Sequence, residues 1–163
     1  MKALVVYDSQ FGNTRWIAQA AGDALAGAAE VQVVPVAEAA PLPEALDLLV
    51  VGGPTQGHGA SPGMKALLDS IGRGSLEGVP AAAFDTRFRM PRWLSGSAAG
   101  VIARRLRTAG ARLVASPESF FVARAKEGPL LPGELERAGA WARAILAAVP
   151  ASGRRSVPAR AAP

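Results

Sequence analysis

The sequence predicts an α/β fold in which helices cover both faces of one parallel sheet. Two observations carry this prediction. Five short apolar segments rich in Val, Leu or Ala alternate with segments that can form helices, and strand–helix alternation is typical of a doubly wound sheet. The apolar segments also lack the polar–apolar alternation of a strand that faces water on one side, so we expect both faces of each strand to be buried.

The expected elements follow in order along the chain. The strands comprise residues 4–7, 31–36, 46–52, 79–84 and 112–122. The helices comprise residues 14–28, 62–71, 97–109 and 131–149, and the first carries an apolar stripe through Ile17, Ala21 and Leu25. Residues 37–45 are too few and too rich in proline for more than a broken helical turn.

Length and composition predict one domain, residues 1–149, and a tail, residues 150–163, that is rich in Ala, Pro, Ser and Gly and is expected to be disordered. The chain has no cysteine, which excludes disulfides and thiolate nucleophiles, so redox chemistry requires a bound cofactor. We assign no metal ligand and no catalytic residue. No apolar run reaches the roughly 18 to 20 residues of a membrane span, and the chain opens on its first strand, so we expect a cytoplasmic protein.

The net charge of +5 is unevenly distributed along the chain. Residues 1–82 carry 4 basic and 8 acidic side chains, whereas residues 83–163 carry 14 basic and 5 acidic ones. Three of these arginines belong to the tail, and without it the net charge is only about +2. Because basic patches with interleaved aromatic residues are missing as well, we expect no nucleic-acid partner.

A candidate anion site follows the first expected strand, where residues 9–14 lead directly into a helix. A phosphate there meets unpaired helix amides, the positive end of the helix dipole and two hydroxyl groups, while Gly12 lets the backbone close around it. The loop lacks the sequence features of a nucleoside-triphosphatase loop, a dinucleotide fingerprint and a small tyrosine phosphatase. A phosphoryl-receiver domain is disfavoured too, since Gly52 and Gly53 stand where its acceptor aspartate is expected.

The order Ser9-x-Phe11-Gly12-Asn13-Thr14 after an apolar strand resembles the phosphate-binding loop of flavodoxins. The resemblance extends to about residue 149 and is closest to the short-chain kind. It implies a flavodoxin-like three-layer sandwich with a five-stranded parallel sheet in the order 2-1-3-4-5, and FMN as the cofactor. The residues that it places around the FMN phosphate are Ser9, Gln10, Phe11, Gly12, Asn13 and Thr14. The alternative is an ordinary strand-to-helix turn with Thr14 as the helix N-cap.

A second loop, residues 52–60, contains four glycines and one proline, so its main chain can approach a planar ligand closely. The resemblance implies that a peptide of this loop, at Gln56–Gly57 or His58–Gly59, can flip to bind the flavin N5. His58 either tunes the reduced ring or is a solvated loop side chain. The implied ring contacts are Pro54, Thr55, Gln56, Gly57, His58 and Gly59.

A third loop follows the fourth expected strand, and by the same resemblance it holds the pyrimidine side of the ring. Phe88 and Trp93 can stack on the flavin, although Trp93 can equally anchor the core. Many flavodoxins have a tyrosine in this loop, whereas the only tyrosine here is Tyr7. The candidate residues of the third loop are Asp85, Thr86, Arg87, Phe88 and Trp93.

Arg87, Arg89 and Arg92 make the third loop basic. A cation close to the flavin N1 stabilises the reduced anion, so we expect a higher reduction potential than that of an acidic flavodoxin, and an acidic docking face on the partner. The alternative is that these arginines solvate the loop or form ion pairs.

The function that these loops favour is FMN-dependent electron transfer with redox partner proteins. One alternative is an FMN-dependent oxidoreductase that acts on a quinone or a protoporphyrinogen, and another is a flavodoxin-like binding module without a cofactor. The compact loops leave little material for a substrate pocket, which favours a carrier over a self-sufficient enzyme. The complete first loop argues against the module without cofactor.

Overall fold

Strands and helices alternate along the chain in the computed structural model, which describes residues 1–124 and 128–150. The strands are β1 (Lys2–Tyr7), β2 (Glu30–Pro35), β3 (Leu48–Gln56), β4 (Gly59–Ala60), β5 (Pro80–Phe88), β6 (Arg112–Leu113) and β7 (Glu118–Val122). The helices are α1 (Asn13–Leu25), α2 (Pro62–Ser70), α3 (Arg92–Ser95), α4 (Ala98–Thr108) and α5 (Glu134–Ala148), with a 3-10 turn at Val36–Glu38. Residues 151–163 of the expected tail lie outside the described residues.

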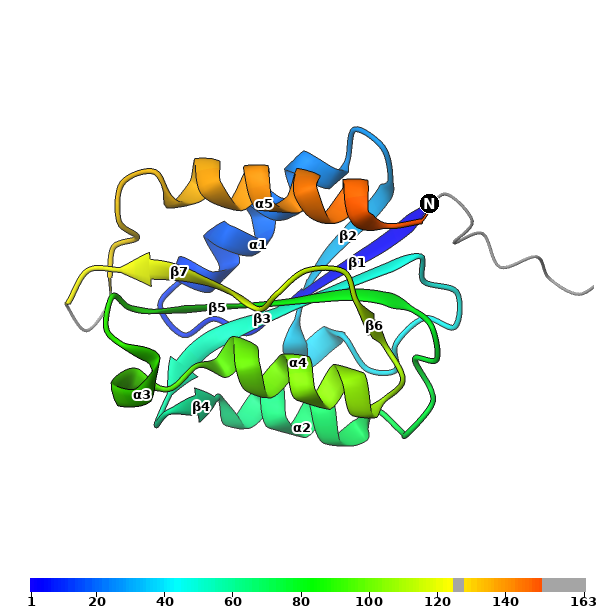
Figure 1. Ribbon diagram of the computed structural model, residues 1–163, viewed down its shortest axis with the longest axis horizontal. Coiled ribbons are helices and arrows are strands. Elements are labelled where there is room, and N and C mark those ends of the chain that lie inside the picture. Colours follow the sequence, from blue (N-terminus) through cyan, green and yellow to red (C-terminus); the bar gives the residue numbers. More distant parts are fainter. Residues whose placement is uncertain (125–127, 151–163) are drawn as a thin grey trace, which may run out of the picture.

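The main sheet is parallel and has the order β2-β1-β3-β5, and both β6 and β7 pair with β5. This confirms the predicted order 2-1-3-4-5, because β5 is the fourth expected strand and β6 and β7 lie in the fifth. Helices α1 and α5 cover one face of the sheet, whereas α2 and α4 cover the other (Figure 1). The carboxyl ends of β1, β3 and β5 therefore meet at one edge of the sheet, where ligands bind in doubly wound folds.

The fifth expected strand, residues 112–122, is divided in two, so the prediction of one continuous strand is wrong. Leu113 pairs with Ala81 and Glu118 pairs with Phe84, so the offset between paired residues grows from 32 to 34. Two additional residues therefore bulge out between β6 and β7. Pro117, the last residue of this break, has no N–H to donate to a neighbouring strand.

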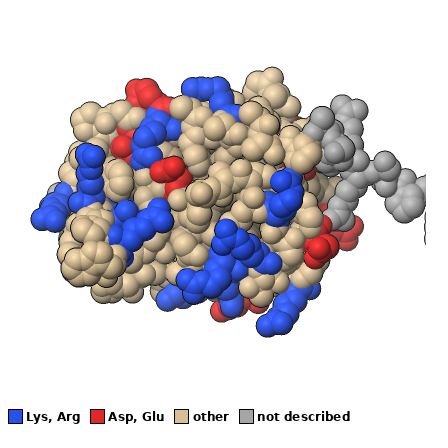
Figure 2. Space-filling view, in the orientation of Figure 1, with Lys and Arg blue, Asp and Glu red and all other residues tan. Residues whose placement is uncertain are grey.

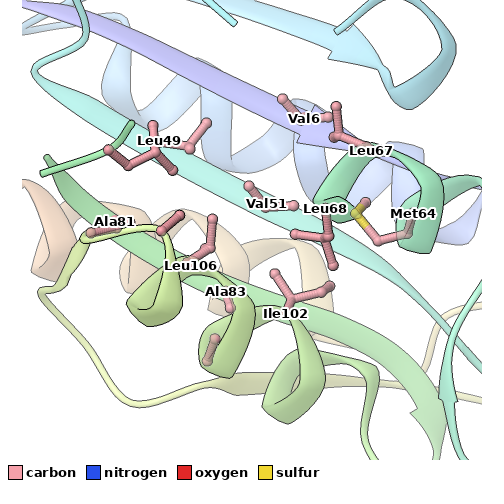
Figure 3. Close-up of a cluster of buried hydrophobic side chains, with 14 of the residues drawn as sticks. Val6, Leu49, Val51, Met64, Leu67, Leu68, Ala81, Ala83, Ile102 and Leu106 are labelled. Carbon is pink, nitrogen blue, oxygen red and sulfur yellow. The ribbon is translucent and has the colours of Figure 1, made fainter. Parts of the chain in front are cut away.

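The core has two layers because alternate residues of each buried strand point to opposite faces of the sheet. Val6 and Val51 pack against α2 and α4, on the side drawn in Figure 3, where Met64 and Ile102 approach the sheet. On the other face, Phe84 contacts Phe120 and Trp141 edge-on, with ring centroids 6.0 and 5.8 Å apart. Strands β1, β3 and β5 are thus covered on both faces, as expected, whereas no residue of the edge strand β2 is fully buried. Among the described residues, no helix is long and apolar enough to cross a bilayer.

Candidate functional site

An open cavity lies at the carboxyl edge of the sheet, where the loops after β1, β3 and β5 meet. Its volume is about 550 Å³ when the solvent-filled space at its mouth is included. All three loops singled out from the sequence contribute to it. The lining residues are Ser9, Gln10, Phe11, Asn13, Thr14, Pro54, Thr55, Gln56, Thr86, Arg87, Phe88, Val122 and Gly128.

The first loop turns sharply between β1 and α1. Gly12 has a φ of +93°, a conformation that strains any residue with a side chain, and its N–H donates to Ser9 Oγ over 3.0 Å. Gly12 also occupies the N-cap position of α1, so no N-cap side chain competes for the first amides of the helix. The alternative in which Thr14 is the N-cap is wrong, because α1 begins at Asn13 and Thr14 lies inside its first turn. This end of the cavity therefore suits an anion.

Two side-chain hydrogen bonds connect the first loop to the other two. The hydroxyl oxygens of Thr14 and Thr86 are 2.7 Å apart and form a buried hydrogen bond. Gln56 Nε2 donates to Gln10 Oε1 over 2.9 Å. These bonds hold the three loops in place before a ligand enters, which lowers the ordering cost of binding.

The second loop is a tight hairpin. Strand β3 continues to Gln56, which pairs with Gly59 of β4. Gly57 and His58 both have positive φ angles, +50° and +69°, as a two-residue type I′ turn requires. Gly57 therefore serves the turn of the hairpin, whereas Gly52 and Gly53 lie inside β3. Of the expected ring contacts, Gly57, His58 and Gly59 do not line the cavity, and the His58 side chain is exposed.

Asp85 is buried completely and does not line the cavity. Its Oδ2 accepts hydrogen bonds from Ser97 Oγ, the Ala99 N–H and Thr55 Oγ1 at 2.7, 3.0 and 3.1 Å. Ser97 is in turn the N-cap of α4. Asp85 thus joins β3, β5 and the start of α4, and it positions Thr55, which does line the cavity.

Arg87 is a buried residue with its own hydrogen-bond partners. Its Nε donates to Ser119 Oγ at 3.0 Å, and its Nη1 donates to the Met90 carbonyl and Ser95 Oγ at 2.6 and 2.9 Å. Burial lowers the pKa of Arg87, although Asp85, 3.9 Å away, acts in the opposite direction. Arg87 remains charged at any ordinary pH.

Arg89 and Arg92 differ from Arg87 because both are exposed. The Arg89 guanidinium carbon lies 5.7 Å from the centre of the Phe121 ring, within cation–π range. Arg92 Nη2 donates to the Pro117 carbonyl over 3.3 Å. Each arginine therefore makes one contact near β7 and keeps its charge accessible to a partner.

The aromatic residues near the cavity fall into two groups. Phe11 and Phe88 line the cavity and are partly exposed, so either can cover a planar ligand. Trp93 lies on α3, does not line the cavity and is 84% exposed. The alternative in which Trp93 anchors the core is therefore wrong, and the structure does not bring Trp93 to the other candidate residues.

Val122 and Gly128 also line the cavity, although no sequence motif pointed to them. Val122 is the last residue of β7, and the shift of two residues between β6 and β7 brings it opposite Phe88. Gly128 packs on the Asn13 side chain so closely that a Cβ at this position would lie 2.3 Å from Asn13 Nδ2. Only the general rule that sites form at the carboxyl ends of parallel strands pointed to this segment.

Comparisons with known proteins give a family and a set of similar folds. The family model described as Flavodoxin matches residues 5–88. Flavodoxin 2 from Bacillus cereus is similar in structure, with a TM-score of 0.73 and 23% identity over 90% of this chain and 99% of that one. A flavodoxin from the domain Archaea has a TM-score of 0.69 and 21% identity, over 91% of this chain and 99% of that one. A short-chain flavodoxin associated with a non-canonical PDU bacterial microcompartment has a TM-score of 0.71 and 19% identity, over 92% of this chain and 99% of that one. No functionally curated protein matches the sequence.

Proposed function

The chain belongs to the flavodoxin family and has its flavin-binding electron-transfer role, and we propose that its flavin is FMN, held without a covalent bond in the cavity at the carboxyl edge of the sheet. When bound, FMN supplies a ring that takes up and releases electrons. The proposed contacts are the cavity-lining residues of the three loops, together with Gly12, whose backbone shapes the first of them.

The observation that carries this proposal is that the first loop and the other two loops line one cavity with different chemical groups. In the first loop, Gly12 and Thr14 offer backbone amides and a hydroxyl group at the start of α1, and the residues 9–14 include no lysine or arginine. Hydrogen bonds and the helix dipole can hold a phosphate there without a cation. From the second and third loops, Pro54 and Phe88 line the same cavity and provide apolar and aromatic surface. A molecule with a phosphate at one end and a planar ring at the other matches both.

The residues of the chain then have distinct tasks. The Thr14–Thr86 and Gln56–Gln10 hydrogen bonds fix the first loop, which would bind the phosphate, relative to the two loops that would bind the ring. Asp85, which does not line the cavity itself, orients Thr55 by accepting a hydrogen bond from its hydroxyl group. The apolar surface around the ring end excludes water from one side of a bound ligand.

An electron carrier with separate partner proteins fits the loops better than a self-sufficient enzyme. An enzyme needs further chain above the ring to enclose its substrate. Here the second loop is a two-residue hairpin turn and the third carries only the four-residue helix α3. The ring end of the cavity therefore stays open to a partner protein.

The test is to purify the chain and to record its absorption spectrum. We expect a yellow protein that releases one FMN per chain on denaturation, identified by chromatography. Reduction by NAD(P)H is expected only when a separate reductase is added. A colourless protein that shows no heat of binding with FMN contradicts the cofactor, and rapid reduction by NAD(P)H alone contradicts the carrier.

A further inference from the structure

The short helix α3 presents an apolar surface that neither the core nor the cavity uses. Trp93 is the most exposed large apolar side chain among the described residues, and its neighbour Leu94 is 46% exposed. Neither residue lines the cavity. Single exposed apolar residues are common, but two adjacent ones at the edge of a binding site are typical of an interaction surface.

Side-chain and backbone contacts hold α3 beside the second loop. Arg87 Nη1 donates to Ser95 Oγ over 2.9 Å, and the Gly96 N–H donates to the Arg92 carbonyl over 2.7 Å. Gly96 lies directly against the His58 backbone, where a Cβ would come within 2.2 Å of the His58 carbonyl oxygen. Helix α3, which carries Trp93, therefore lies next to the β3–β4 hairpin (Figure 1). A partner that contacts Trp93 approaches the ring end of the cavity.

The exposed charges of the described loops at the edge that holds α3 are basic. The described loop residues at this edge of the sheet are 8–12, 57–58, 89–97, 123–124 and 128–133. Their exposed charges are Arg89, Arg92 and Arg124, and their one carboxylate, Asp8, is half-buried and bonded to Ser61. In Figure 2, Lys and Arg side chains border the uncharged surface at the end of the molecule that holds α3. Such a patch attracts an acidic surface and repels a basic one.

We propose that α3 and its flanking arginines form the docking surface for an acidic redox protein. The surface consists of Arg89, Arg92, Trp93 and Leu94. The arginines steer a partner whose redox centre is surrounded by Asp and Glu, and Trp93 supplies the central apolar contact, a usual role for tryptophan in interfaces. This inference rests on the proposed function, because it takes the open ring end as the place where electrons leave or enter.

The test measures binding of a strongly acidic [2Fe–2S] ferredoxin to the whole chain by titration calorimetry. We expect the dissociation constant to rise as salt is added, since exposed charges are screened. The R89Q/R92Q double variant is expected to bind about tenfold more weakly at low salt, in keeping with the effect of several interfacial charges. A matched control, R104Q/R107Q, removes two exposed arginines from α4 and is expected to bind almost as the original chain does.

A second pair of variants tests the apolar contact. Trp93→Ala is expected to weaken ferredoxin binding about tenfold at low and high salt alike, as for a central interface residue. Trp16→Ala, which removes another exposed tryptophan from α1, is expected to leave this binding unchanged. The affinity of Trp93→Ala for FMN is expected to equal that of the original chain.

Three results overturn the docking proposal. They are no measurable ferredoxin binding at low salt, equal losses in R89Q/R92Q and R104Q/R107Q, and weaker FMN binding by Trp93→Ala with unchanged ferredoxin binding. The FMN content of each sample is measured separately from its absorbance. A chain that docks the ferredoxin but holds no FMN therefore contradicts the proposed function and supports the docking surface, whereas a yellow chain that does not dock does the reverse.

Discussion

Replacing Gly52 by alanine tests how β3 packs against the aromatic core. Gly52 is paired with Tyr7 on one side and with Phe84 on the other. A Cβ added to Gly52 would lie 2.1 to 2.4 Å from three carbons of the Phe84 ring, whereas ordinary contacts begin at 3.4 Å. The ring must therefore move by about 1 Å to admit one methyl group.

The cost of this movement follows from the surroundings of the ring. Phe84 is completely buried and contacts Phe120 and Trp141 edge-on. Overpacking a buried site costs about 1–3 kcal/mol, and each disturbed aromatic pair costs a further ~0.5–1.5 kcal/mol. We therefore expect Gly52→Ala to lower the free energy of unfolding by about 3 kcal/mol.

The assay is urea unfolding of a double-mutant cycle with Phe84→Leu. In the Phe84→Leu background the ring is absent, so Gly52→Ala should cost less than about 1 kcal/mol, which gives a coupling of about 2 kcal/mol between the two sites. Gly72→Ala is the control, because a Cβ at Gly72 meets nothing within 4 Å. The reasoning is refuted if Gly52→Ala costs the same in both backgrounds, or if it is as mild as Gly72→Ala.

Three further substitutions test hydrogen bonds around the cavity by the same unfolding assay. Thr14→Val removes a buried hydrogen bond and should lower the free energy of unfolding by about 1–2 kcal/mol. Part of this loss should be regained when Thr86→Val is added, because neither partner is then left unpaired. Additive losses in the double variant would contradict this expectation. Asp85→Asn weakens three hydrogen bonds to a buried carboxylate and should lower the free energy of unfolding by about 2 kcal/mol. Its control, Glu118→Gln, affects a partly exposed ion pair and should cost less than about 1 kcal/mol. Equal losses of stability in the two variants would contradict this expectation. Ser61→Ala removes both the N-cap of α2 and the hydrogen bond from Ser61 to Asp8, and it should cost at least about 1 kcal/mol; a stability unchanged from the original chain argues against both contacts.

The sheet order and the position of the cavity could be predicted because they depend on local patterns. Continuous apolar segments indicate strands covered on both faces, and one loop motif after β1 marks the start of α1. The expected fourth strand ended at Phe84, since the polar residues that follow end the apolar run. In the structure β5 continues to Phe88, because β7 pairs with it from Phe84 onward. Asp85 and Arg87 are thus buried strand residues whose partners lie on other elements.

The remaining differences also come from contacts between distant segments. The bulge between β6 and β7 brings Val122 to the cavity, and no local pattern of the sequence encodes that shift. Trp93 could be assigned to a ring, to the core or to solvent on composition alone. Its exposure follows from the packing of α3 beside the β3–β4 hairpin, where Gly96 contacts the His58 backbone.

Residues 9–14 are proposed to bind the phosphate of FMN. A comparison of the affinities of the chain for FMN and for riboflavin tests this role most directly. Riboflavin has the same ring and ribityl chain but no phosphate. Titration calorimetry should give a dissociation constant for FMN at least about a hundredfold lower than that for riboflavin, because amide and hydroxyl hydrogen bonds to a charged phosphate are strong. Equal affinities for the two flavins would contradict the claim.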